Sequence, residues 1–78
     1  MIRKTLSIII TFDLTEQAIA AEAFCQKQRL PGRLIPVPRE ITAGCGLSWK
    51  APPDAKDLLC KSFEEGGILW EKVYLLEV

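Results

Sequence analysis

The side chains best suited to chemistry in this sequence are its three cysteines, Cys25, Cys45 and Cys60. Because the sequence contains no histidine, one chain holds no Ser-His-Asp or Cys-His catalytic arrangement and no zinc site that uses histidine. The cysteines lie far apart, their number is odd, and no Cys-x-x-Cys pair occurs. This pattern argues against a metal site and against the disulfide framework of a secreted protein. We therefore expect free thiols, no metal and a cytoplasmic location.

Cys45 differs from the other two cysteines because glycine flanks it on both sides, at Gly44 and Gly46. Glycine removes steric cover and permits unusual backbone angles, which favours an exposed thiol in a loop. The stretch around it carries four cations and one acid, namely Arg29, Arg33, Arg39 and Lys50 against Glu40. Local positive charge favours the thiolate, the nucleophilic form of cysteine. The residues alone leave two interpretations open: a reactive thiol, or a turn whose cysteine packs inward.

Strand-like and helix-like patterns alternate along the chain and must position these thiols. Residues 5–12 are β-branched and apolar, which predicts a strand in the middle of a sheet. Asp13 and Glu16 have capping-box spacing at the start of an Ala-rich helix that extends to Gln28. The other expected elements are strands over 33–37 and 46–50, a helix from 52–54 to 66–67, and a last strand over 68–78 with a bend near 71–72.

Cys25 and Cys60 lie at apolar positions of the two expected helices. A free cysteine in such a place behaves as a small hydrophobic residue and is chemically inert. The apolar stripe of the first helix consists of Leu14, Ala18, Ala21, Phe24 and Cys25. We therefore expect both helical cysteines to belong to the core.

The element order βαββαβ favours an α+β, ferredoxin-like fold, with a four-stranded antiparallel sheet and both helices on one face. The usual strand order, 4-1-3-2, puts the second strand at an edge. An edge suits Pro36 and Pro38, which both lack a ladder donor. The same topology predicts that the loop with Cys45 lies beside the first turn of the first helix, residues 13–16, and beside residues 65–67.

Length and charge restrict the class of function further. Seventy-eight residues suffice for a single domain, 1–78, with one small core. Ten Lys plus Arg balance ten Asp plus Glu, so no excess of positive charge attracts nucleic acid or an anionic membrane. The apolar run after Arg3 and Lys4 is too short for a membrane span or a signal peptide. We expect no binding to nucleic acid or membrane, while a homodimer is compatible with so small a chain.

A set of motifs along the chain is typical of one protein family. Residues 33–41 read Arg-Leu-Ile-Pro-Val-Pro-Arg-Glu-Ile, and residues 45–47 add a Cys-Gly-Leu motif. Further matches are Phe12, the pattern formed by Ala18, Ala21 and Glu22, and the closing Gly67-Ile68. With these motifs, nearly the whole chain resembles the selenium/sulfur (Se/S) carrier-like proteins, a family of small bacterial proteins.

The resemblance implies a carrier rather than a true catalyst. In such a carrier Cys45 holds sulfur or selenium as a persulfide or perselenide, accepts it from a donor enzyme of the cysteine desulfurase kind, and passes it to an acceptor protein. No cofactor is implied. The residues that we assign to supporting the thiolate or docking the partner are Arg39, Gly44, Gly46, Leu47, Pro36 and Pro38.

Two other functions remain open. The first is a non-enzymatic regulatory or protein-interaction module in which Cys45 is incidental, and an exposed Trp49 or Trp70 on a dimer face would support it. The second is a redox-sensing thiol, although no resolving cysteine lies close to Cys45 in the sequence.

Overall fold

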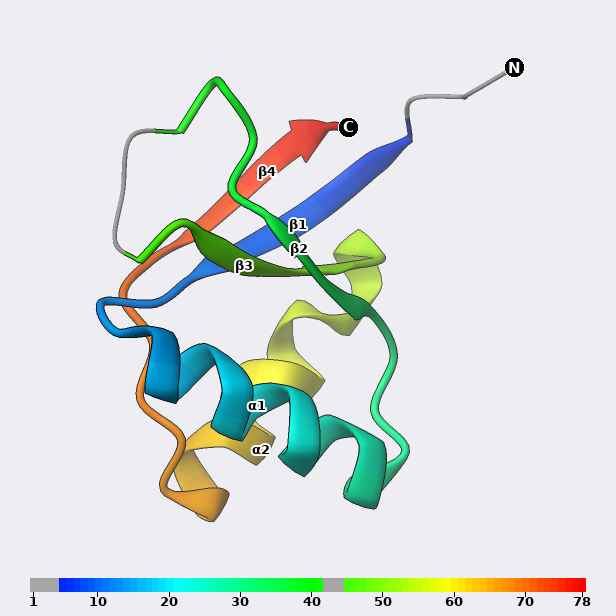
Figure 1. Ribbon diagram of the computed structural model, residues 1–78. Helices are drawn as coiled ribbons and strands as arrows, with labels where there is room; N and C mark the ends of the chain where they lie inside the picture. Colours follow the sequence, from blue (N-terminus) through cyan, green and yellow to red (C-terminus); the bar gives the residue numbers. More distant parts are fainter. Residues whose placement is uncertain (1–4, 42–44) are drawn as a thin grey trace.

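The computed structural model describes residues 5–41 and 45–78. Four strands form one antiparallel sheet, and two helices cover one of its faces (Figure 1). The elements are β1 (Leu6–Thr11), α1 (Thr15–Gln28), β2 (Arg33–Pro36), β3 (Leu47–Ala51), the 3-10 turn η1 (Pro53–Ala55), α2 (Lys56–Gly66) and β4 (Val73–Glu77). This architecture confirms the expected α+β, ferredoxin-like fold.

The strand order is β2-β3-β1-β4, so β1 is central and β2 lies at an edge. The backbone N–H of Val37 donates to the Gly46 carbonyl at 2.9 Å, which means that Val37 faces β3. Because alternate residues of an antiparallel strand face opposite sides, the nitrogen of Pro36 points away from β3. Its missing N–H therefore breaks no ladder hydrogen bond, as a proline in an edge strand requires.

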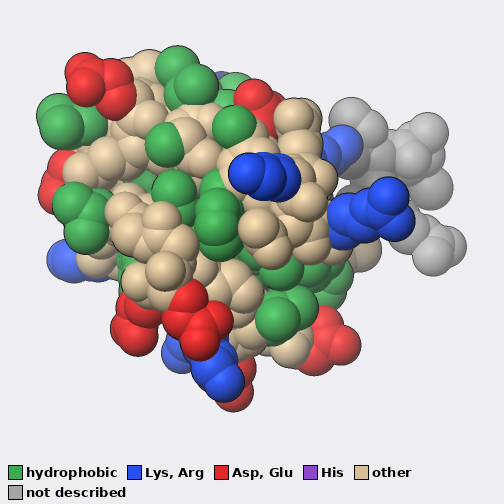
Figure 2. All heavy atoms as spheres, turned by 90° about the horizontal axis from the view of Figure 1, so that it is seen from below, with side chains coloured by type: hydrophobic (Ala, Val, Ile, Leu, Met, Phe, Trp, Pro, Cys, Tyr) green, Lys and Arg blue, Asp and Glu red, His purple; other side chains and the backbone are tan. Residues whose placement is uncertain are grey.

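The main core lies between the sheet and the helices. Side chains from β1 and β3 meet the small residues of α1 and the larger residues of α2 there. Phe63 lies at the centre, with ring centroids 6.5 Å from Phe12, 6.1 Å from Phe24 and 6.0 Å from Trp70. Viewed from below in Figure 2, the surface shows hydrophobic side chains between acidic and basic groups.

A second apolar contact region lies on the opposite face of the sheet. Ile9 alternates with Ile8 and Ile10 along β1, so it faces away from the helices, yet it is fully buried. Ile41 is also buried and does not belong to the helix-side core. The chain that follows β2 rises on this face of the sheet (Figure 1). There the Ile41 N–H closes a turn onto the Pro38 carbonyl at 3.0 Å.

The start of α1 differs from the expected capping box. The residue that precedes the helix is Leu14, not Asp13, and its N–H donates to the side-chain oxygen of Gln17 at 3.4 Å. Asp13 lies one position too early to cap the helix. Leu14 is 54% exposed, so it does not belong to the buried stripe of Ala18, Ala21 and Cys25.

The last strand is shorter than expected but bends where the sequence predicts. β4 begins at Val73, and the two residues before it both pair with Thr11. The Glu71 N–H donates to the Thr11 carbonyl at 2.7 Å, and the Thr11 N–H donates to the Lys72 carbonyl at 2.9 Å. The Thr11 hydroxyl also donates to the Glu71 carboxylate at 3.1 Å. Two residues opposite one form a bulge, which explains the bend.

The sequence predicts that residues 65–67, at the end of α2, lie beside the Cys45 loop and the first turn of α1, but the structure places Gly66 elsewhere. A methyl group at Gly66 would collide with the ring of Phe24, so this glycine packs against the second half of α1 and not against its first turn.

Among the helices of the described residues, none has the length and apolar character needed to cross a bilayer.

Candidate functional site

Cys45 lies where the β2–β3 connection meets the end of β1. Its backbone N–H donates to the Phe12 carbonyl at 3.0 Å, directly after the last residue of the central strand. The next residue, Gly46, accepts the hydrogen bond from Val37 that extends the β2–β3 hairpin by one pair. The backbone around Cys45 is thus hydrogen-bonded to two strands of the sheet, which limits the movement of the residue that carries the thiol.

The side chain of Cys45 is half-buried and packs against the helix-side core. Its thiol makes one long contact, at 3.8 Å, with the carbonyl oxygen of Leu47, the first residue of β3. A thiol is a weak hydrogen-bond donor, so this contact orients the sulfur but costs little free energy to break. The contact with the core agrees with a cysteine that packs inward, although Cys45 is not fully buried.

Gly46, the residue after Cys45, has open space beside its Cα. It is exposed and has a φ of 90°, a conformation that glycine adopts without strain. A methyl group built on it would meet nothing within 4 Å.

The other residues assigned from the sequence lie along the same connection. Pro36 ends β2 and is exposed, and Pro38 and Arg39 form the turn closed by Ile41, with Arg39 exposed. Leu47 is half-buried against the core. Gly44 lies outside the described residues.

The first turn of α1 lies beside the site, as the topology predicts. The Cys45 N–H is hydrogen-bonded to the carbonyl of Phe12, which lies three positions before Thr15, the first residue of α1. The positive end of the helix dipole favours an anion nearby, and Glu16 in the first turn opposes that effect.

Cys25 and Cys60 have environments that disfavour the thiolate. Cys25 is 1% exposed, and burial raises its pKa from 9.0 to about 11. The pKa of Cys60 is also raised, mainly by burial; the charge of Lys56 lowers it, and the carboxylates of Asp57 and Glu64 each raise it by less. Cys25 belongs to the core as expected, whereas Cys60 is only half-buried. Its helix turns it partly away from the core residues Leu59 and Phe63.

Two features of the site escaped sequence reasoning. One is the Phe12 carbonyl that anchors Cys45, since a backbone acceptor has no signature in the sequence. The other is an exposed apolar side chain on the neighbouring helix α1, Ile19, which is 55% exposed. The sequence signal for Ile19 is an apolar residue that follows the buried Ala18 but lies outside the apolar stripe of the helix.

A protein-family model matches most of the chain. The model of the family described as "Putative Se/S carrier protein-like" matches residues 7–75, which include the whole β2–β3 connection and Cys45. The chain therefore belongs to the Se/S carrier-like family. No curated protein and no solved structure matches it.

Proposed function

We propose that this protein carries sulfur or selenium on Cys45, as a persulfide or perselenide, between a donor enzyme and an acceptor protein. The observation that supports this most is the coincidence of two facts. The family match covers the Cys-Gly-Leu motif, and Cys45 is only half-buried, next to a glycine with open space beside it.

The transfer is a thiol–disulfide type of exchange. The Cys45 thiol loses its proton, and the thiolate attacks the outer sulfur of a cysteine persulfide on the donor. The S–S bond of the donor breaks, its cysteine leaves as a thiolate, and Cys45 keeps the sulfane sulfur in a new S–S bond. The same step onto an acceptor thiolate discharges the carrier. No electrons are gained or lost overall, so no cofactor is needed.

The proposed roles of the other residues follow from this chemistry. Arg39 stabilises the anion at Cys45 as the partner approaches, and Gly44 and Gly46 admit the partner's cysteine. Leu47 holds the thiol through its carbonyl. The surface around Pro36 and Pro38 receives the partner, through side-chain contacts rather than strand addition, since Pro36 offers no outward N–H.

The interaction-module alternative loses one of its two possible supports. Trp49 is 3% exposed, and its indole N–H donates to the Pro31 carbonyl at 3.0 Å, so it cannot form a dimer face. Trp70 is half-buried and packs against Phe63. The carrier is therefore the function we favour.

Intact-mass spectrometry after incubation with a cysteine desulfurase and cysteine tests the proposal. We expect an adduct of one sulfur atom on the wild-type chain and on Cys25→Ser and Cys60→Ser, and none on Cys45→Ser. Cys60→Ser is the matched control because Cys60 is the other half-buried thiol. Absence of any adduct, or its survival in Cys45→Ser, would reject the carrier function.

A further inference from the structure

The end of the sheet far from Cys45 carries a hollow of about 500 Å³. It lies where β1 and β2 begin and β3 ends, and two of its lining residues are the cations Arg33 and Lys50. A volume of this size falls within the range of small-molecule sites, about 300–1,000 Å³. None of the described lining residues is acidic.

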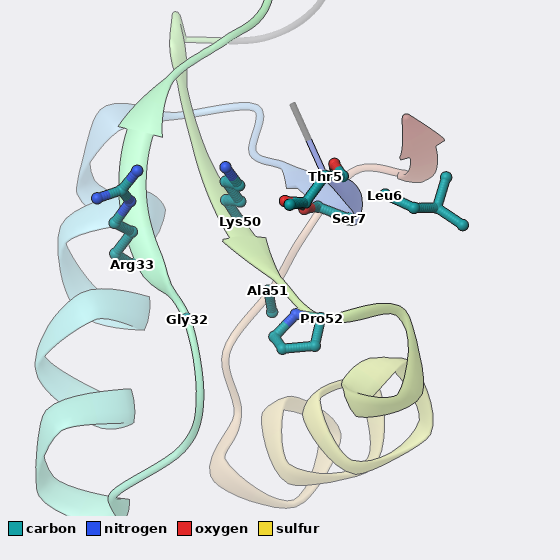
Figure 3. Close-up of a pocket in the computed structure, with 8 residues that line it drawn as sticks. All are labelled: Thr5, Leu6, Ser7, Gly32, Arg33, Lys50, Ala51 and Pro52. Carbon is teal, nitrogen blue, oxygen red and sulfur yellow. Dashed lines mark hydrogen bonds between the residues drawn. The ribbon is translucent and has the colours of Figure 1, made fainter. Parts of the chain in front are cut away.

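The two cations lie directly opposite each other on neighbouring strands. Arg33 of β2 is paired with Lys50 of β3, so their side chains are on the same face of the sheet. Figure 3 shows both side chains extending to the same side, with Lys50 between Arg33 and the hydroxyl groups of Thr5 and Ser7. Like charges directly opposite each other destabilise a sheet unless an anion separates them.

The hydrogen bonds of this cluster leave donors available. The Lys50 ammonium donates once, to the Val78 carbonyl at 3.2 Å, and an ammonium has three N–H groups. Arg33 is exposed and offers a planar fork that suits the two oxygens of a carboxylate or phosphate. Pro52 supplies an apolar wall beside the cations, whereas Leu6 points away from them on the other side of β1 (Figure 3).

We propose that this hollow binds a small organic anion. Its phosphate or carboxylate lies between Arg33 and Lys50, and its carbon skeleton lies against Pro52. The inference goes beyond the carrier function, because Thr5 and Phe12 are at opposite ends of the central strand, roughly 23 Å apart at strand spacing. The site does not depend on Cys45.

Titration followed by backbone amide NMR shifts tests this proposal with three probes: phenyl phosphate, benzoate and the neutral benzyl alcohol. We expect phenyl phosphate to bind more tightly than benzoate, because it carries more charge, and benzyl alcohol not to bind. The shifts should be confined to Thr5–Ser7, Arg33 and Lys50. Binding of benzyl alcohol as strong as that of the anions, or the same shifts with sodium chloride at equal ionic strength, would overturn the proposal.

Charge-removing variants identify the groups responsible. Arg33→Gln and Lys50→Gln should each weaken binding of phenyl phosphate by about tenfold, the effect of losing a charge-assisted hydrogen bond. Lys61→Gln removes an exposed cation of α2 and should leave the affinity unchanged, as should Cys45→Ser. The amide spectrum away from the hollow verifies folding of each variant. Equal affinity in Lys50→Gln, Arg33→Gln and Lys61→Gln would also reject the site.

Discussion

At the scale of single residues, the three cysteines are distinguished by their surroundings. Cys25 is fully buried, and Cys60 is half-buried beside carboxylates; the pKa of each thiol is raised. Cys45 is half-buried at a strand end, with glycine after it and space beyond that glycine. Thiolate formation and access together decide thiol reactivity, so Cys45 is the thiol that we expect to react first.

Arg39 provides a test of the electrostatic part of this account. We predict that Arg39→Ala slows alkylation of Cys45 by iodoacetamide at neutral pH by about two- to fivefold, a modest effect because Arg39 is exposed and water screens its charge. Peptide-resolved mass spectrometry gives the rate for each cysteine. Lys61→Ala is the control and should change nothing. An unaltered rate in Arg39→Ala would mean that this arginine serves the turn or the partner surface instead.

Cys25 makes the stability of the fold depend on alkaline pH. Its pKa is about 11 in the folded chain against an ordinary value of 9.0, so the folded state holds the proton more tightly than the unfolded state. This contribution to stability is complete below the unfolded pKa of 9.0 and is lost as the pH rises through about 11. A difference of that size corresponds to roughly 2–3 kcal/mol.

Urea unfolding of the wild-type chain and of Cys25→Ala measures this contribution. Between about pH 8 and pH 11, the free energy of unfolding should fall by roughly 2–3 kcal/mol more in the wild type than in Cys25→Ala. In the wild type, the Cys25 thiol ionises in the unfolded chain at a lower pH than in the folded chain, and the variant has no such thiol. All other ionisable groups are the same in both chains, so their contributions cancel in the difference. Parallel pH profiles for the two chains would show that Cys25 does not contribute in this way.

At the scale of elements, two glycines have similar backbone conformations and different surroundings. Gly32 and Gly46 have φ of 113° and 90°. A methyl group at Gly32 would collide with the Lys50 carbonyl and the Trp49 indole, whereas at Gly46 it would meet nothing within 4 Å. Gly32 therefore permits the close approach of the chain before β2 to β3, and Gly46 serves only the turn and the open space at the site.

Alanine at the two positions separates backbone strain from collision. We predict that Gly46→Ala costs about 1–2 kcal/mol of stability from the positive φ alone. Gly32→Ala should cost about 1–3 kcal/mol more, since β2 must also move away from the buried Trp49. Urea unfolding followed by tryptophan fluorescence measures both. Equal losses would show that the contact at Gly32 relaxes without moving the strand.

At the scale of the whole molecule, the topology was predictable because independent sequence features agree. The unbroken apolar run of β1 indicated a central strand, and Pro36 indicated an edge; both are confirmed. The cover on the far face of the sheet was not predictable. Ile41 follows a Pro-Arg-Glu turn that sequence rules describe only as a loop, and its burial opposite the helices depends on the path of the chain.

The candidate site was predictable in part. Glycines around Cys45 indicated an accessible thiol, and the structure shows a half-buried Cys45 that contacts the core. Its anchoring to Phe12 comes from a tertiary hydrogen bond between segments over thirty residues apart. Local reasoning also failed for Asp13, because the choice of N-cap depends on where the chain leaves β1.

Mapping the transferred sulfur on the wild-type chain tests the central claim most directly. The chain is loaded with a cysteine desulfurase and radiolabelled cysteine, alkylated, digested without reductant, and analysed peptide by peptide before and after addition of an acceptor thiol. We predict that the label is on the Cys45 peptide alone and that it leaves as the acceptor gains it. Label on the Cys60 peptide, label spread over all three cysteines, or label that the acceptor cannot remove would contradict a carrier function for Cys45.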